Sequence, residues 1–270
     1  MIMEQVTVGE VSRRGILFGA GKSALGVAGV TALASVVPGM VSTAHALGGT
    51  TEKWPWPYQK LDPATTAEMA YQEWYRVYCG AAVISSVFSQ LREKVGSPYK
   101  DFPIDAFTFL EGGVSGWGTI CGANAGANVV TNLIIGPRPP LGSSGDGMMM
   151  GSEIMQWYST TALPMHAPKE PKFKGVLVKT VSDSPLCHVS VGKWMKAADK
   201  DLGSPERKDR CARVTADVAF QLVTLLNDWK DGTYKTKGVN NAAKFGIQTQ
   251  LNCSDCHSGA RPTPPKAKKT

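Results

Sequence analysis

Near the C-terminal end of the 270-residue chain, Cys253, Cys256 and His257 form a C-x-x-C-H motif. Two thiols separated by two residues can form thioethers with the vinyl groups of a haem, while the following histidine binds the iron. A chance match and a thioredoxin-like redox site are the alternatives. However, no alternating pattern of strands and helices surrounds the motif, as a thioredoxin-like site would require. The motif therefore predicts one covalently attached c-type haem with His257 as an axial ligand.

The iron of such a haem takes its second axial ligand from histidine or methionine. Besides His257, the histidines after residue 46 are His166 and His188. The methionine candidates are Met148, Met149, Met150, Met155 and Met165. Because a single histidine is more often a surface or core residue than a ligand, the residues alone leave this choice open.

The N-terminal stretch SRRGILFGAGKSALGVAGVTALASVVPGMVSTAHA is typical of an export signal. It combines the arginine pair Arg13 and Arg14 with an apolar segment and a small-x-small end, so we expect cleavage after Ala46. An uncleaved membrane anchor is the alternative, but Lys22 and Pro38 interrupt the apolar run. The predicted location is the periplasm, reached by the twin-arginine route. That route carries folded proteins, which suggests a cofactor besides the haem, since covalent haem attaches after export.

Four further cysteines precede the haem motif: Cys79, Cys121, Cys187 and Cys211. In an exported protein two disulfides are the simplest interpretation. Their surroundings favour metal binding, because Cys121 lies in the small-residue run GTICGANAGA, and Cys187 and Cys211 lie near the starts of predicted helices. Helix starts stabilise thiolates and anionic clusters. Four thiolates that converge in a helical domain can hold an iron–sulfur cluster or a zinc ion.

Helical patterns dominate the elements that must position these residues. The Asp62-Pro63 pair predicts a helix start, and apolar spacing continues to Gly96, with Gly80 as a possible break. A long helix is expected to start at Ser204-Pro205-Glu206 and to run to about Trp229. Shorter helices are expected at 104–113, 117–134 and 152–163, loops at 136–151 and 164–175, and one strand at 176–179. The sequence thus predicts an all-α, mostly helical bundle with long loops and little β structure.

The domain organisation that follows has three parts: a signal peptide at 1–46, a helical four-cysteine domain at 47–232, and a haem-attachment segment with a basic tail at 233–270. The formal net charge is +7, but its basic residues are spread out and not interleaved with aromatic ones. This pattern argues against nucleic acid as a partner. No segment after residue 46 is apolar enough to predict membrane insertion. A Ser-His-Asp set, a paired-carboxylate site and a phosphate-binding loop are all absent.

Several stretches resemble the family named for its C, GCAxxG, C and C motif: YCGAAVISSVFSQL, FLEGGVSGWGTICGANAGANVV, CHVSVGKWM and RCARVTADVAFQLVTLL. The resemblance covers roughly Asp62 to Asp228. The haem-bearing relatives in this family are the split-Soret cytochromes c. Carried over residue by residue, the resemblance assigns the four motif cysteines to Cys79, Cys121, Cys187 and Cys211. It implies a homodimer with closely packed bis-histidine haems, axial ligands that can come from the partner chain, and an iron–sulfur centre, expected to be of the two-iron two-sulfur type.

The chain departs from the family pattern in its haem count. The resemblance implies two haems per chain, yet there is one C-x-x-C-H motif, and three histidines follow residue 46. We therefore expect one haem per chain and two per dimer. His188 is the preferred second axial ligand because it stands next to Cys187 in the family-like CHVSVGKW stretch, and His166 is the second choice. This adjacency would join the two redox centres by a short covalent path.

The leading hypothesis is an exported electron-transfer protein that serves redox partner proteins, as yet unidentified. The second is an oxidoreductase that reduces a small molecule at an open metal position. In the third, the haem is retained but the four upstream cysteines form disulfides or a zinc site.

The glycines around Cys121 have two interpretations. They allow close packing of helices, or they shield a cluster.

Overall fold

The computed structural model describes residues 53–139, 141–142 and 144–236. The predicted signal peptide and the haem residues Cys253, Cys256 and His257 lie outside the described residues. The predictions made for them, and the domain boundaries, therefore stay predictions.

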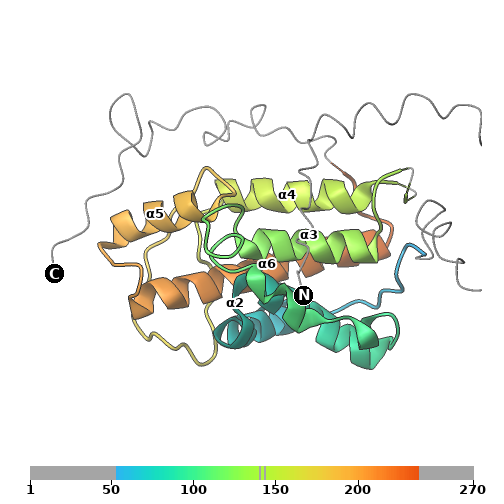
Figure 1. Ribbon diagram of the computed structural model, residues 1–270, viewed down its shortest axis with the longest axis horizontal. Coiled ribbons are helices and arrows are strands. Elements are labelled where there is room, and N and C mark those ends of the chain that lie inside the picture. Colours follow the sequence, from blue (N-terminus) through green and yellow to red (C-terminus); the bar gives the residue numbers. More distant parts are fainter. Residues whose placement is uncertain (1–52, 140, 143, 237–270) are drawn as a thin grey trace, which may run out of the picture. The chain divides into compact units, whose positions relative to one another are not determined.

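The described residues are mostly helical, as predicted (Figure 1). The helices are α2 (Pro63–Lys94), α3 (Gly122–Ile134), α4 (Asp146–Thr160), α5 (Cys187–Ala198) and α6 (Pro205–Lys230), with 3₁₀ turns η2 (Tyr99–Asp101) and η3 (Ile104–Phe109). Both long helices start as their sequences predict. The side chain of Asp62 accepts the N–H of Thr65, and that of Ser204 accepts the N–H of Arg207, with proline next in the chain after each cap.

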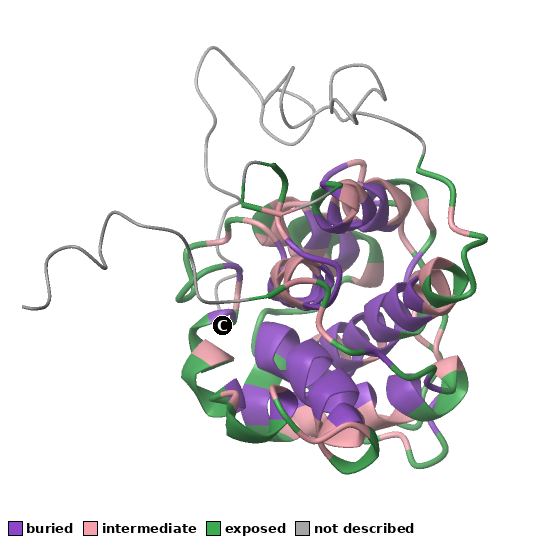
Figure 2. Ribbon diagram, turned by 90° about the vertical axis from the view of Figure 1, so that its right-hand side faces the viewer, coloured by how far each residue is buried: buried purple, intermediate pink, exposed green. Residues whose placement is uncertain are grey.

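Helix α2 packs against α6 and α3, and α3 also packs against α4 and α6. Figure 2 shows the buried residues along the faces that these helices turn toward one another. The core includes the fully buried side chains of Tyr71, Ile84, Phe88, Ile134, Ile154 and Leu222. Burial of such apolar side chains contributes roughly 1.5–3 kcal/mol each, which makes this core the main source of stability.

Two of the expected helix starts were wrong. Helix α3 begins at Gly122 and not at Trp117, because residues 112–118 include four glycines with positive φ angles. Helix α4 begins at Asp146 and not at Ser152. Its glycines permit close packing instead of forming a loop: a Cβ on Gly151 would lie 2.0 Å from Oδ1 of Asn128 in α3.

The predicted strand at 176–179 was also wrong. Between helices, the described residues form two isolated β-bridges, Ile120 with Leu186 and Leu163 with Thr180. Val176 is 99% exposed, so the segment lacks the neighbouring strand that a sheet would require.

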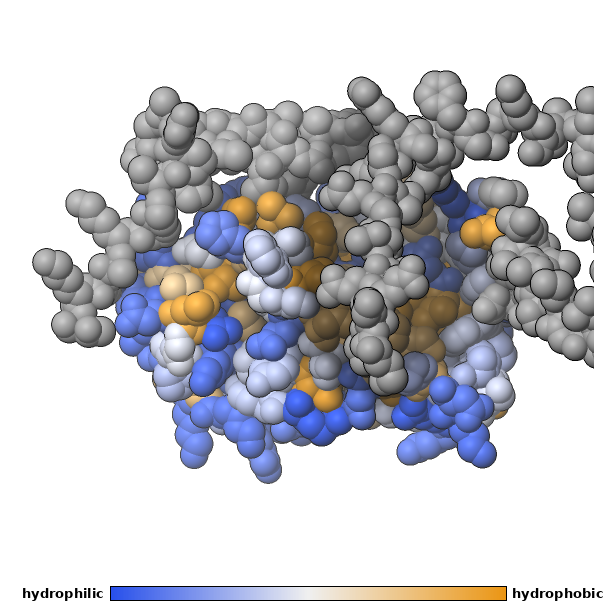
Figure 3. Space-filling view, in the orientation of Figure 1, coloured by the Kyte–Doolittle hydropathy of each residue, from blue (hydrophilic) through white to orange (hydrophobic). Residues whose placement is uncertain are grey.

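No helix among the described residues is both long and apolar enough to cross a lipid bilayer. The face seen in Figure 3 carries hydrophobic groups beside a strongly hydrophilic lower edge. The large exposed apolar side chains include Trp117, which is 85% exposed in the glycine-rich loop before α3.

Candidate four-cysteine metal centre

The four upstream cysteines come from four different helices. Cys79 lies within α2, Cys121 is the N-cap of α3, Cys187 is the first residue of α5, and Cys211 lies in the second turn of α6. All four are free thiols, so the structure contains neither of the two disulfides considered above. Cys79, Cys121 and Cys211 are buried, and Cys187 is half-buried.

A break in α2 sets the position of Cys79. The helix was expected to break at Gly80, but the residue with non-helical angles is Tyr78, with φ 61° and ψ −167°. That region of backbone conformation is almost restricted to glycine, so Tyr78 is strained. After the break, the N–H of Gly80 donates to Leu110 O at 3.1 Å. The indole N–H of Trp74 donates to the Sγ of Cys79 at 3.2 Å.

A short backbone ladder holds Cys121 beside Cys187. The N–H of Cys121 donates to Pro185 O, and the N–H of Cys187 donates to Thr119 O. The ladder continues one residue further, where the N–H of His188 donates to Gly118 O at 3.0 Å. It therefore joins the glycine-rich loop to the start of α5, although these segments lie far apart in the sequence.

Glycines allow α2 and α3 to approach closely at the same place. A Cβ on Gly122 would lie 1.9 Å from Leu110 O and 2.9 Å from the Cβ of Cys79. A Cβ on Gly126 would lie 2.4 Å from Gly80 O. Backbone atoms cannot yield to such contacts, so the structure supports the packing interpretation of these glycines.

The thiols share one electrostatic environment. Burial raises the pKa of Cys79 well above its ordinary value, and the neighbouring Cys121, Cys211 and Cys187 raise it further. Burial likewise raises the pKa of Cys187 to about 12, with added contributions from Cys121 and Cys211. Each thiolate thus opposes the ionisation of the others. A bound cation would reverse this balance, because it favours deprotonated thiols.

Four cysteines are a suitable set of ligands for a metal–sulfur centre, although their side chains do not yet surround one point. Nowhere in residues 53–139, 141–142 and 144–236 do three or more His, Cys, Asp or Glu side chains stand in metal-binding geometry. Four free thiols, three of them buried, are nevertheless the kind of ligands that iron–sulfur clusters and zinc ions prefer. A shared ion would draw these thiolates together.

Several polar groups that the sequence analysis missed surround the thiols. Trp74 donates to Cys79, and a guanidinium N–H of Arg210 points at the Sγ of Cys211 at 3.9 Å. Burial raises the pKa of Cys121, and a hydrogen bond with the hydroxyl of Tyr158 lowers it in part. Arg210 had a visible signal, since it directly precedes Cys211. Trp74 and Tyr158 had none: Trp74 meets Cys79 across the break in α2, and helix packing brings Tyr158 to Cys121.

The two candidate axial histidines lie in different surroundings. His188 is exposed on the first turn of α5, next to Cys187. His166 is half-buried, with its Nε2 3.3 Å from Oε2 of Glu68 and its backbone N–H donating to Asp217 at 2.8 Å. Burial lowers the pKa of His166, and Glu68 opposes that effect.

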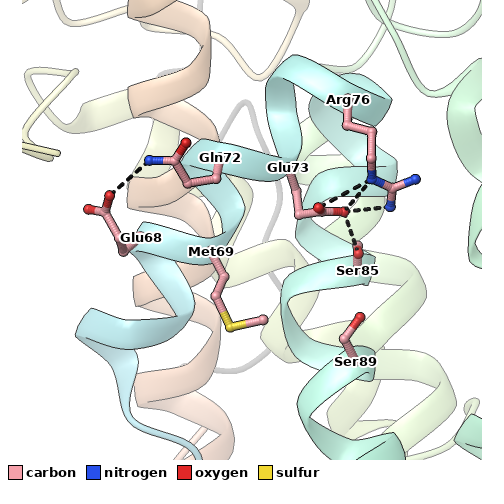
Figure 4. A pocket seen from close by; sticks show the side chains of 7 residues that line it. All are labelled: Glu68, Met69, Gln72, Glu73, Arg76, Ser85 and Ser89. Carbon is pink, nitrogen blue, oxygen red and sulfur yellow. Dashed lines mark hydrogen bonds and ion pairs between the residues drawn. The ribbon is translucent and has the colours of Figure 1, made fainter. Parts of the chain in front are cut away.

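A cavity of about 290 Å³ lies beside the break in α2, away from the thiols (Figure 4). Its polar side chains are engaged with one another: Glu73 accepts from Arg76 at 2.6 Å and from Ser85 at 2.7 Å. The charge of Glu73 is therefore balanced by Arg76, and neither cysteine nor histidine lines this cavity.

Residues 77–225 match the family described as "Putative redox-active protein (C_GCAxxG_C_C)". The match covers more than half of the chain and includes Cys79, Cys121, Cys187 and Cys211. The chain belongs to the C_GCAxxG_C_C family. The resemblance inferred from the sequence is thereby confirmed, and a redox role follows from membership of this C_GCAxxG_C_C group.

Two comparisons connect this C_GCAxxG_C_C protein to the haem-bearing branch. The split-Soret cytochrome c of Desulfovibrio desulfuricans (strain ATCC 27774 / DSM 6949 / MB) is 33% identical over 256 residues, which are 92% of this chain and 87% of the relative. The solved structure reported as "A novel iron centre in the split-Soret cytochrome c from Desulfovibrio desulfuricans ATCC 27774" superposes with a TM-score of 0.63 at 32% identity. That superposition covers 79% of this chain and 91% of the other.

Proposed function

We propose that the protein is a periplasmic electron-transfer protein with two redox centres. One is a c-type haem attached to Cys253 and Cys256 with His257 as an axial ligand. The other is an iron–sulfur centre, of the two-iron two-sulfur type, on the four cysteines of the helical domain. The observation that carries the proposal is that four free thiols from four helices lie near one another. Backbone hydrogen bonds join the segments of Cys121 and Cys187, and Cys79 packs against Gly122 at the start of α3.

Such a centre would accept and release single electrons when bound. The chain's own residues would supply its environment. Burial excludes water from three of the four thiols, and the N–H of Trp74 lies at hydrogen-bonding distance from one of them. Hydrogen bonds to the sulfur atoms and low solvent exposure are the factors by which proteins tune such centres. The iron centre named for the Desulfovibrio relative supports this assignment.

For the second axial ligand of the haem we propose His188. Its side chain is exposed to solvent and stands next to Cys187, whereas that of His166 is half-buried beside Glu68. The ligand would come from the same chain or from the partner subunit of a homodimer. Two haems meeting at a twofold axis would couple their transitions, in keeping with the split-Soret name of the relative.

Metal analysis of variants purified without oxygen tests both centres. In C79S and C121S we expect non-haem iron and acid-labile sulfide to fall while covalent haem stays at one per chain. In C253S and C256S we expect the reverse. Non-haem iron and sulfide near zero in the wild-type protein would overturn the iron–sulfur assignment and leave zinc or free thiols.

The haem ligand is tested by spectroscopy of the reduced protein with carbon monoxide. A bis-histidine haem should show an unchanged spectrum, and H188A should open the site to carbon monoxide while H166A does not. Binding of carbon monoxide by the wild-type protein would instead favour an enzyme with an open metal position. Sedimentation as a stable monomer would contradict the homodimer.

A further inference from the structure

Arg210 is a buried positive charge without a carboxylate partner. Its side chain is 2% exposed, and within the described residues no Asp or Glu forms an ion pair with it. Its Nε atom is buried and has no hydrogen-bond partner. Removing a cation from water costs several kcal/mol unless an anion or strong acceptors compensate.

The guanidinium is held in place by neutral groups on two other helices. One terminal N–H donates to the Oγ of Ser190 in α5 at 2.7 Å, and the hydroxyl of Tyr158 in α4 donates to the same oxygen at 2.7 Å. The other terminal nitrogen lies 3.9 Å from the Sγ of Cys211. All of these groups are fully buried or nearly so. They fix the charge at the thiols and do not neutralise it.

The nearby carboxylates are committed elsewhere. Asp209 is the partner of Arg213 at 2.6 Å and also accepts from the hydroxyls of Tyr71 and Tyr75. Asp217 accepts the backbone N–H groups of Met165 and His166, both at 2.8 Å. Asp217 acts on Arg210 through its charge but forms no ion pair with it. The groups that favour the charged guanidinium are Tyr158 and the thiols of Cys211 and Cys121, and Cys211 is also at hydrogen-bonding distance.

We propose that Arg210 is the fixed counter-charge of the four-cysteine centre, and that Ser190 and Tyr158 position its guanidinium against Cys211 and Cys121. This inference rests on the proposed function. Arg210 keeps its proton throughout, while a one-electron donor, such as a reduced haem iron, adds one negative charge to the centre without breaking a bond. A positive charge at this distance favours the reduced state and raises the reduction potential.

The test is the midpoint potential of the non-haem centre, measured by redox titration with electron paramagnetic resonance in the full-length, haem-loaded protein. In R210M the reduction equilibrium should fall at least tenfold, which is about 59 mV for one electron. R210K keeps the charge and should recover most of that loss. S190A removes the anchor and should lower the potential in the same direction.

The D209N/R213M double variant is the matched control. It removes an arginine charge from the same helix together with the carboxylate that neutralises it, so the net charge stays the same. It should leave the potential unchanged. The proposal is overturned if R210K loses as much as R210M, or if D209N/R213M shifts the potential equally. If R210M does not fold, S190A decides: a wild-type potential in S190A overturns the proposal. If the wild-type protein contained no non-haem iron, the proposed function itself would be wrong. If the iron were present but R210M had the wild-type potential, only this inference would be wrong.

Discussion

At the scale of single residues, Tyr78 is the clearest departure from ordinary backbone geometry near the thiols. Its φ of 61° lies within a helix, and its side chain is 41% exposed. Strain of this kind costs on the order of 1–3 kcal/mol and persists only where the surroundings enforce it. The packing of Gly80 against Leu110 directly after the break supplies that enforcement. The strain therefore serves to aim Cys79 away from the regular path of α2.

Two variants at Tyr78 separate strain from side-chain packing. Y78A removes the ring, which packs edge-on against Trp74 at a centroid distance of 5.8 Å. Y78G removes the ring and the strain together. We expect Y78G to be more stable than Y78A by about 1 kcal/mol in chemical denaturation, after allowing for the greater unfolded-state entropy of glycine. Equal stabilities, or a more stable Y78A, would show that the backbone at Tyr78 is not strained.

The buried phenols predict a loss of stability in alkali. Burial raises the pKa of Tyr58 and of Tyr99, whose hydroxyls donate to Asn227 and to Pro57 O. Because the folded-state pKa exceeds the unfolded value near 10, their contribution is full below pH 10 and falls as the pH rises above it. Denaturant titrations between pH 8 and 11 should show this decline, and the Y58F/Y99F double variant should show a shallower one. A wild-type slope that the double variant leaves unchanged would contradict the prediction.

At the scale of elements, the contact between α2 and α3 depends on glycines that face each other. Gly126 stands against Gly80 O, and Gly122 stands against Leu110 O and Cys79. This contact fixes the distance between the helices that carry Cys79 and Cys121. A change there should therefore act on both stability and the metal centre.

G126A should destabilise the protein by about 2 kcal/mol, because its Cβ would overlap backbone atoms of α2. G192A is the matched control, since a Cβ there meets nothing within 4 Å. As a helix-interior substitution of glycine, G192A should stabilise by about 0.5–1 kcal/mol. Thermal and denaturant unfolding of both variants, together with non-haem iron content, checks the pair. An equally tolerated G126A would rule out close packing as the role of Gly126.

At the scale of the whole molecule, the proposed metal centre joins four helices through cysteines between residues 79 and 211. A ligand set spread this widely cannot form in the unfolded chain, so metal binding adds to the free energy of folding. Without metal, the raised pKa values of Cys79, Cys121 and Cys187 keep these thiols protonated, and the stabilisation by metal binding is missing. Stability and loading should therefore rise and fall together.

Removal of the non-haem iron should lower the melting temperature of the haem-loaded protein, and reconstitution with iron and sulfide should restore it. Differential scanning calorimetry of the three preparations measures the effect. The C79S variant serves as the control, because chelator should change its melting temperature little. If the iron-free protein had the same melting temperature as the holoprotein, the iron would not be bound by the four cysteines.

Processing of the N-terminus is the second test at this scale. Export by the predicted signal would leave a mature chain that starts at Leu47. Mass spectrometry of protein recovered from the periplasmic fraction should give that N-terminus plus one covalent haem. Replacement of Arg13 and Arg14 by lysine should retain the protein inside the cell, and export of that variant would exclude the twin-arginine route.

The sequence by itself determined the helical class, the caps of α2 and α6, and the family, since these depend on local spacing and on motifs within short segments. It also identified the cysteines, because residue type alone limits which chemistry they can support. Other features needed the tertiary structure. The break at Tyr78, the helical start of α4 and the absence of a strand at 176–179 all depend on contacts between segments distant in sequence.

The surroundings of the thiols were likewise decided by packing. Trp74, Tyr158 and Ser190 come from α2, α4 and α5, and no local pattern marks them as neighbours of sulfur. Only Arg210 had a local signal, because it directly precedes Cys211. Their effect depends on burial, which strengthens every electrostatic interaction and belongs to the fold as a whole. The sequence therefore identified the cysteines proposed as metal ligands, and the packing of the five helices determined the electrostatic field around their thiols.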